Sequence, residues 1–180
     1  MSIARRIVAV IVVVAGAYAF YVFCVLPYRC NQIKKKQLLS TEYAFERAAT
    51  PEGRIRAREN LAMLLPCARA SCRDVSLDML IAANYRVLGQ PQEAIRYYRD
   101  ALRRDRRPEI YVNLATTEIA AGDRNAARED FVQASLFSPW TISRIEDGLL
   151  RQEVVKRMIA LRPESAEYIR YIDTIPPSGP

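Results

Sequence analysis

Residues 75–107 read VSLDMLIAANYRVLGQPQEAIRYYRDALRRDRR, and residues 108–139 read PEIYVNLATTEIAAGDRNAAREDFVQASLFSP. The two segments align without a gap at an offset of 33 residues. The matched pairs include Gly89 with Gly122, Ala94 with Ala127, Tyr98 with Phe131, and Ala101 with Ala134. Similarity at a fixed spacing is typical of repeat proteins, in which each repeat is one supersecondary unit. We therefore expect two consecutive helical hairpins.

The residue types at the matched positions have physical reasons in a helical hairpin. Gly89 and Gly122 lie where one helix would end and the chain turn back, which favours the left-handed backbone conformation. Alanines would let neighbouring helices approach closely, and the aromatic pair would fill the space between adjacent hairpins. Pro139 cannot continue a helix and is expected to close the second repeat.

This pattern resembles the tetratricopeptide repeat (TPR), a helix–turn–helix of about 34 residues. The matching residues in the first copy are Ala82, Tyr85, Gly89, Ala94, Tyr98 and Ala101. Those in the second copy are Tyr111, Leu114, Ala115, Gly122, Ala127, Phe131, Ala134 and Pro139. The chain departs from the family pattern at Asp78, which occupies a large apolar position, and at Glu118, which replaces the usual Tyr. The resemblance implies an all-α fold with a short TPR-like superhelix of helical hairpins.

The resemblance also implies a concave groove lined by the first helix of each hairpin. By position in the family pattern, its residues are Met79, Ala83, Arg86, Val112, Asn113 and Thr116, joined by Ile142 and Ile145 from the segment that follows. Asn113 matches a position where the family often hydrogen-bonds a peptide backbone, and Arg86 would pair with a carboxylate. Because two repeats form only a short groove, a structural helical spacer without a peptide groove stays an alternative.

An apolar run of twenty residues, Ile7–Leu26, precedes the repeats, and only Gly16 in it falls outside the hydrophobic set. As a helix it would span about 30 Å at roughly 1.5 Å per residue, which is the thickness of a bilayer core. The sequence therefore predicts a single transmembrane anchor, which Pro27 is expected to end. A cleaved signal peptide is the alternative, since Ala17-Tyr18-Ala19 fits a cleavage site, but the run continues beyond it.

The net charge of +7 is concentrated near this anchor. Six of the 27 basic residues and none of the 20 acidic ones lie within residues 1–36, so the rest of the chain is nearly neutral. This distribution argues against nucleic-acid binding, and Arg29, Lys34, Lys35 and Lys36 are expected to contact lipid headgroups. The basic run 103–107 is expected to be a solvated turn rather than a phosphate site.

The chain contains no His, which removes most zinc sites and imidazole bases. No pair of carboxylates stands alone in an apolar pattern that would mark an acid–base couple. We therefore expect neither enzymatic activity nor a cofactor nor a metal.

The side of the membrane is ambiguous from charge alone, because basic residues flank both ends of the apolar run. Arg5 and Arg6 abut the run, which favours a body outside the cytoplasm. Cys67 and Cys72 lie between an expected helix end at Pro66 and an expected helix start near Asp74. They would either form a disulfide, which needs an oxidising compartment, or serve as two small buried hydrophobic residues. We expect the bacterial inner membrane with the body on the periplasmic side; a cytoplasm-facing scaffold is the alternative.

The flanking segments complete the expected organisation. Thr50 would cap a helix over 52–65 that follows a helix over 41–48, and 141–161 is expected to form one long capping helix. The expected domains are a tail and anchor (1–28), a basic juxtamembrane segment (29–40), a degenerate hairpin (41–72), TPR 1 (73–107), TPR 2 (108–139), capping helices (140–172) and a disordered tail (173–180).

The sequence thus predicts a single-pass membrane protein whose helical domain binds a partner protein or peptide at the membrane surface. Its expected place is as an accessory or assembly subunit of a bacterial envelope complex. The small-residue patch around Gly16 would let the anchor itself contact another membrane helix.

Overall fold

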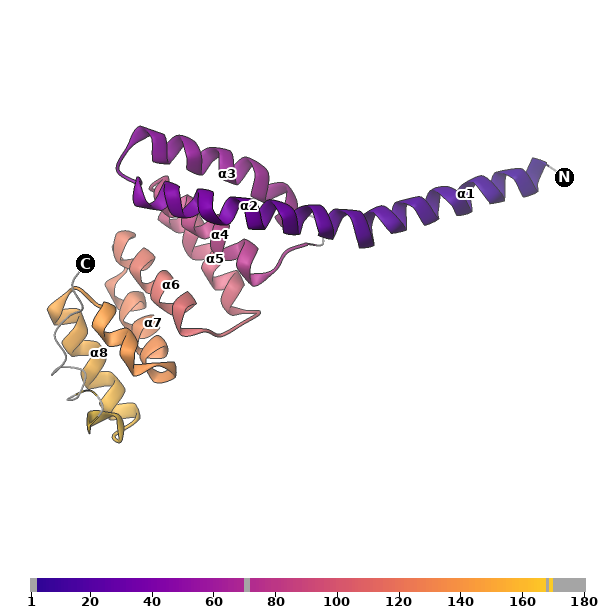
Figure 1. Cartoon of the computed structure of the whole chain (residues 1–180). Helices are drawn as coiled ribbons and strands as arrows, with labels where there is room; N and C mark the ends of the chain where they lie inside the picture. The colour runs from indigo at the N-terminus through magenta and orange to yellow at the C-terminus, as the bar shows by residue number, and fades with distance from the viewer. Residues whose placement is uncertain (1–2, 70–71, 168, 170–180) are drawn as a thin grey trace. The chain divides into compact units, whose positions relative to one another are not determined.

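The computed structural model describes residues 3–69, 72–167 and 169, and its regular elements in these ranges are all helical (Figure 1). The elements are α1 (Ile3–Phe20), η1 (Tyr21–Val25), α2 (Leu26–Glu46), α3 (Pro51–Arg69), α4 (Val75–Val87), α5 (Pro91–Leu102), α6 (Pro108–Ala120), α7 (Arg124–Phe137), η2 (Pro139–Arg144) and α8 (Gly148–Leu161). The predicted all-α class is confirmed. The chain divides into two compact units, Met1–Val87 and Leu88–Pro180, which we call unit 1 and unit 2.

The predicted anchor is part of a longer continuous helix. Residues Ile7–Glu46 form 40 helical residues, and none of the most apolar 18-residue window within them is buried. By length and composition this helix can cross a membrane.

The prediction that Pro27 ends this helix is wrong, because Pro27 lies in the first turn of α2 and the helix runs on. Pro27 has no N–H to donate to the preceding turn, and its ring crowds that turn. The π-helical turn Tyr21–Val25 lies directly before it, and the Leu26 N–H donates to the Tyr21 carbonyl five residues back. Such a widened turn absorbs the misfit locally and leaves the helix intact on both sides.

Unit 1 is built on α2, which packs against both α3 and α4 (Figure 1). A buried polar network joins these three helices. Ser40 Oγ donates to Asn60 Oδ1 (2.7 Å), Asn60 Nδ2 to Asn84 Oδ1 (2.9 Å), and Asn84 Nδ2 to Thr41 Oγ1 (2.9 Å). Because a buried polar group without a partner is costly, this network fixes the register of the three helices.

The predicted start of α3 is confirmed, since the Gly53 N–H donates to Thr50 Oγ1 at 3.2 Å and Pro51 is the first helical residue. The expected helix end at Pro66 is wrong, because α3 continues through it to Arg69. Asp74 caps α4, since the Leu77 N–H donates to Asp74 Oδ1 at 2.8 Å. The expected helix start near Asp74 is therefore confirmed.

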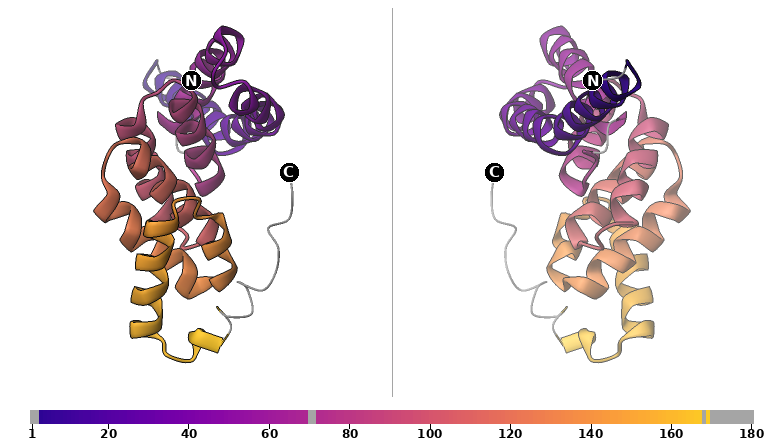
Figure 2. Two further views of the ribbon diagram at one scale, coloured as in Figure 1. Left: turned by 90° about the vertical axis from the view of Figure 1, so that its left-hand side faces the viewer. Right: turned by 90° about the vertical axis from the view of Figure 1, so that its right-hand side faces the viewer.

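In unit 2, α5 to α8 follow one another, and each packs against the next along the chain (Figures 1 and 2). The main core of this unit includes Phe131 and Val132 of α7 with Leu150 and Val154 of α8. A smaller cluster is formed by Ile142, Met158 and Ile169. The C-terminal elements therefore complete the core of unit 2.

The expected single helix over 141–161 is wrong. The structure instead has the short η2, an interruption, and α8, whose first turn is capped by Asp147 (Leu150 N–H to Oδ1, 2.9 Å). An Asp at this position favours a helix start, which breaks the expected continuous helix. Of the expected last helix over 164–172, only 165–167 and 169 are described, and they are helical; the expected disordered tail 173–180 lies outside the described residues.

The turn glycines behave as predicted, with φ of 68° at Gly89 and 83° at Gly122. The expected domain boundaries fit less closely. The basic segment 29–40 and the start of the degenerate hairpin at 41 both lie inside α2. The boundary between the compact units follows Val87, so α4 and α5 of the expected first repeat belong to different units.

A substitution at Gly53 tests the close approach of the first turn of α3 to the residue that follows α2. A Cβ there would lie 2.1 Å from the Arg47 carbonyl oxygen, which is backbone and cannot rotate away. We expect Gly53→Ala to lower the free energy of unfolding by about 1–3 kcal/mol, the usual range for overpacking. Gly148→Ala is the matched control, because a Cβ at that helical position meets nothing within 4 Å. Urea unfolding followed by circular dichroism measures both; equal stabilities of the two variants would contradict the close approach.

Candidate functional site

Three of the expected groove residues lie on α4 of unit 1. Met79, Ala83 and Arg86 are all partly buried. The Arg86 guanidinium lies over the Phe45 ring of α2, 5.0 Å from its centroid. A cation in this position is attracted by the ring, so Arg86 already has a partner within its own unit.

The other three lie on α6 of unit 2, and they differ in accessibility. Asn113 is partly buried and Thr116 is exposed, one turn apart on the same helix face. Thr116 Oγ1 donates to the Val112 carbonyl at 2.8 Å. Val112 itself is 4% exposed and belongs to the core with α7 and α8, and its role in a groove stays a prediction.

Ile142 and Ile145, expected to extend the groove, are also buried in the core of unit 2. Their apolar side chains are covered because the C-terminal segment turns back onto α7 rather than continuing as one helix. The six expected groove residues are divided equally between the two units, and a groove lined by all six stays a prediction.

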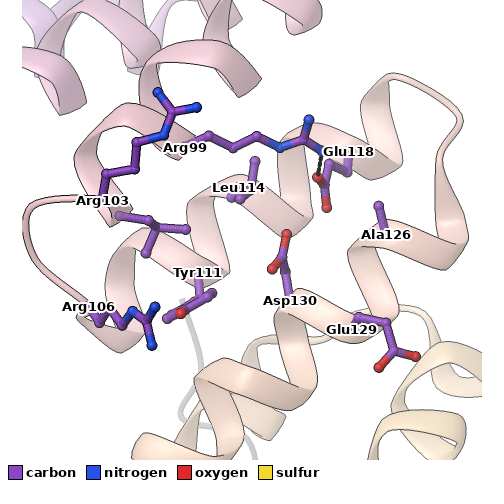
Figure 3. A pocket seen from close by; sticks show the side chains of 10 residues that line it. Arg99, Arg103, Arg106, Tyr111, Leu114, Glu118, Ala126, Glu129 and Asp130 are labelled. Atoms are coloured by element: carbon purple, nitrogen blue, oxygen red, sulfur yellow. Dashed lines mark hydrogen bonds and ion pairs between the residues drawn. The ribbon is translucent and has the colours of Figure 1, made fainter.

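A pocket of about 420 Å³ opens in unit 2 among α5, α6 and α7 (Figure 3). Its lining residues are Arg99, Leu102, Arg103, Arg106, Tyr111, Leu114, Glu118, Ala126, Glu129 and Asp130. Arginines come from α5 and the turn after it, whereas carboxylates come from α6 and α7. The pocket therefore has a positive and a negative side, with apolar groups between them.

Two arginines of the pocket come from the basic run 103–107, which we expected to be a solvated turn. Arg103 and Arg106 are exposed, and Arg103 Nη1 pairs with Asp100 Oδ1 at 2.5 Å. Arg107, in the same run, pairs with Asp105 (2.7 Å) and does not line the pocket. The run is thus an exposed turn, as expected, but part of it also forms one wall of a pocket.

The negative side is dominated by Glu118, which is 1% exposed. Its Oε1 accepts a hydrogen bond from Arg99 Nη2 at 2.9 Å, whereas its buried Oε2 has no hydrogen-bond partner among the described residues. Asp130 projects from α7 toward this carboxyl group (Figure 3). Burial and the neighbouring Asp130 together raise the pKa of Glu118 to about 7, against the opposing effect of Arg99.

The pKa of Asp130 is raised as well, mainly by its burial. Two carboxyl groups this close cannot both ionise readily, so the pair holds a proton near neutral pH. Sequence reasoning noted Glu118 as a departure from the repeat pattern but missed Arg99 and Asp130. An acid at a large apolar position was the available signal, since a buried acid needs an opposite charge or a proton.

The lining of the pocket combines exposed guanidinium groups, carboxyl groups and apolar side chains. In the described parts of the chain, no group of three or more Cys, Asp or Glu side chains is arranged to hold a metal ion. Exposed guanidinium groups bind carboxylates through paired N–H donors, and the apolar floor with Tyr111 would accept an aliphatic or aromatic side chain.

The remaining predicted site residues lie in unit 1. Arg29, Lys35 and Lys36 are exposed on α2, whereas Lys34 is partly buried and forms an ion pair with Asp74. Their contact with lipid headgroups stays a prediction. Cys67 is buried in α3 and Cys72 is partly exposed in the segment before α4. Both are free thiols in this structure, and their pairing with each other stays a prediction.

A scan against models of known protein families finds no match to this chain. A comparison with curated proteins likewise finds none that is similar. The site is therefore interpreted from its own residues.

The Glu118–Asp130 pair predicts a pH dependence of stability. In the unfolded chain Glu118 loses its proton near pH 4.5, and in the folded protein it keeps it to about pH 7. Between these values the folded state binds more protons, so the free energy of unfolding falls as the pH rises. Glu118→Gln, which can still accept from Arg99, should remove much of this fall.

Urea unfolding at several pH values from 4.5 to 8 measures the effect. Glu109→Gln, which removes an exposed carboxylate from the first turn of α6 outside this pocket, is the control and should unfold with the wild-type pH dependence. An unchanged pH dependence in Glu118→Gln would contradict the shared proton.

Proposed function

We propose that this protein is a membrane-anchored helical scaffold of the tetratricopeptide type that binds a partner protein or peptide at the membrane surface. We place it as an accessory or assembly subunit of a bacterial envelope complex. The observation that carries the proposal is the continuous helix Ile7–Glu46, whose apolar half is exposed and whose other half is the packing platform of unit 1.

Exposure of the apolar half supports the anchor. Large hydrophobic side chains of α1 are more than half exposed along its length, among them Val10 (62%), Val13 (70%) and Phe20 (63%). A contiguous apolar surface of this length is unfavourable in water and is matched by the hydrocarbon core of a bilayer. Because the helix continues without a break into α2, the anchor would hold the packed helices α2, α3 and α4 directly at the membrane surface.

The repeat assignment is supported by the environments of the matched residues. Ala82 and Ala115, Ala94 and Ala127, Tyr98 and Phe131, and Ala101 and Ala134 are all at most 1% exposed. Both turn glycines have positive φ. Each matched pair therefore has the same burial or backbone conformation, as expected when two segments share one structural role.

The partner-binding surface that we propose is the pocket of unit 2 together with the exposed face of α6 that carries Asn113 and Thr116. Arg103 and Arg106 would bind a carboxylate of the partner, from an acidic side chain or a chain end. The ion pair between exposed Arg99 and buried Glu118 would join the positive side of the pocket to its negative side.

A charge-reversal comparison tests this surface. We expect Arg103→Glu combined with Arg106→Glu to weaken partner capture at least about tenfold, since two charge-assisted hydrogen bonds are replaced by repulsion. Lys156→Glu combined with Arg157→Glu is the matched control, because it reverses two exposed basic residues of α8 outside this pocket. Photo-crosslinking in native membranes followed by mass spectrometry identifies and quantifies the partner.

If the pocket variant captures the partner as well as the wild type does, the pocket is not the binding surface. The α6 face is then tested with Asn113→Lys and Thr116→Lys. If both sets of variants keep their helical spectrum and crosslink as the wild type does, the protein is a spacer and the proposed surface is wrong.

The side of the membrane needs its own experiment, because a cytoplasm-facing scaffold of the same fold is the alternative. Gln152 is exposed on α8, so Gln152→Cys provides an accessible thiol, with the wild type as background. We expect a membrane-impermeant maleimide to label it in cells whose outer membrane alone has been opened. Labelling only after the inner membrane is disrupted would place the body in the cytoplasm.

A further inference from the structure

Three of the four cysteines gather on one side of unit 1. Cys30 of α2 and Cys67 of α3 are 2% and 3% exposed, and Cys72 lies in the segment before α4 with part of its surface accessible. Burial raises the pKa of the Cys30 thiol, and the neighbouring thiols of Cys67 and Cys72 also act on it. Cys30 is thus the central member of the group, whereas the intramolecular pairing expected from the sequence was that of Cys67 with Cys72.

An ion pair holds Cys72 near Cys30. Lys34 lies one turn after Cys30 on α2, and its Nζ pairs with Oδ2 of Asp74, two residues after Cys72. The same Asp74 caps α4 through the Leu77 N–H. The ion pair therefore places the start of α4, two residues beyond Cys72, against α2 one turn beyond Cys30.

We propose that Cys30 and Cys72 form a disulfide that fastens the membrane-proximal turn of α2 to the start of α4. The reaction consumes one external disulfide, RSSR, of a small thiol or a thiol oxidoreductase. The Cys72 thiolate attacks one sulfur of RSSR and expels RS⁻; the Cys30 thiolate then attacks the Cys72 sulfur of the mixed disulfide and expels the second RS⁻. The two cysteine thiols are oxidised, RSSR is reduced to two RSH, and their protons go to the leaving thiolates.

Accessibility and contacts select this pair over the alternatives. Cys72 is the accessible member, which allows it to react first with an external disulfide. Cys67 lies within α3, because this helix continues past Pro66, and its thiol donates back to the Met63 carbonyl at 3.8 Å. A bond between Cys30 and Cys67 would have to start from two buried thiols.

Burial raises the pKa of Cys72 to about 11, so its thiol is protonated at neutral pH and uncatalysed exchange is slow. Nearby Lys34 acts in the opposite direction and favours the thiolate. The pairing itself depends only on this cluster, but its formation in cells rests on the proposed function, since that places unit 1 in an oxidising compartment.

The experiment uses the full chain in detergent micelles. The reduced protein is equilibrated with glutathione and its disulfide over a range of ratios, quenched with acid, alkylated and digested, and the linked peptides are identified by mass spectrometry. We expect the Cys30–Cys72 peptide in the wild type and in Cys67→Ser. Oxidation of Cys67→Ser should raise its unfolding midpoint by at least about 5 °C, because the bond closes a long loop.

Linked peptides that join Cys67 to Cys72 or to Cys30 in most wild-type molecules would overturn the proposal. So would thiols of Cys30 and Cys72 that stay alkylatable at the most oxidising ratio. Lys34→Met, which removes the ion pair, should slow formation of the bond, whereas Lys35→Met, an exposed neighbour, should not.

Alkylation of whole cells before lysis separates this proposal from the proposed function. If Cys30 and Cys72 pair in micelles but are reduced in cells, the bond in cells is excluded and the extracytoplasmic location is contradicted. Cys30 and Cys72 could instead fail to pair in micelles while the maleimide labels Gln152→Cys in cells whose outer membrane alone has been opened. The extracytoplasmic location is then supported, and only the proposed disulfide is wrong.

Discussion

The missing N–H of Pro27 has to be accommodated at the point where the apolar helix joins the folded part of the chain. A break there would leave a hinge between anchor and body. The π-turn Tyr21–Val25 instead preserves the helix, so α2 continues the direction of α1 into unit 1. The rest of unit 1 depends on this continuity, because α3 and α4 both pack on α2 and the buried network of Asn60 and Asn84 is anchored to it.

Buried acids mark the places where this chain differs from the repeat that it resembles. Asp78 is fully buried with an ion pair to Arg73 Nε at 2.6 Å, and Glu118 is buried with an ion pair to Arg99. An opposite charge offsets part of the desolvation cost in each case. Glu118 differs because Asp130 is its neighbour, and together with burial this second acid raises the pKa of Glu118 to about 7. The carboxyl groups of Glu118, Glu129 and Asp130 form the negative side of the pocket of unit 2.

Structural features that depend on a few consecutive residues were predicted correctly from the sequence. Features that depend on contacts between distant residues were not. Gly89 and Gly122 adopt the left-handed conformation, and Thr50 and Asp74 lie at the helix starts, because these features depend on a few consecutive residues. Pro27 and Pro66 did not end their helices. A proline removes one backbone hydrogen bond, and at Pro27 the preceding π-turn Tyr21–Val25 accommodates that loss.

The sequence by itself determined the all-helical class, the apolar segment of membrane-spanning length and the spacing of the turn glycines. Each of these follows from composition and periodicity along the chain. Only the tertiary structure decided that Val112 and Ile145 are covered, that the pKa of Glu118 is raised and that the Cys30 thiol has the Cys72 thiol as a neighbour. Burial, proton affinity and thiol proximity depend on contacts between residues far apart in the sequence, and local patterns do not specify those contacts.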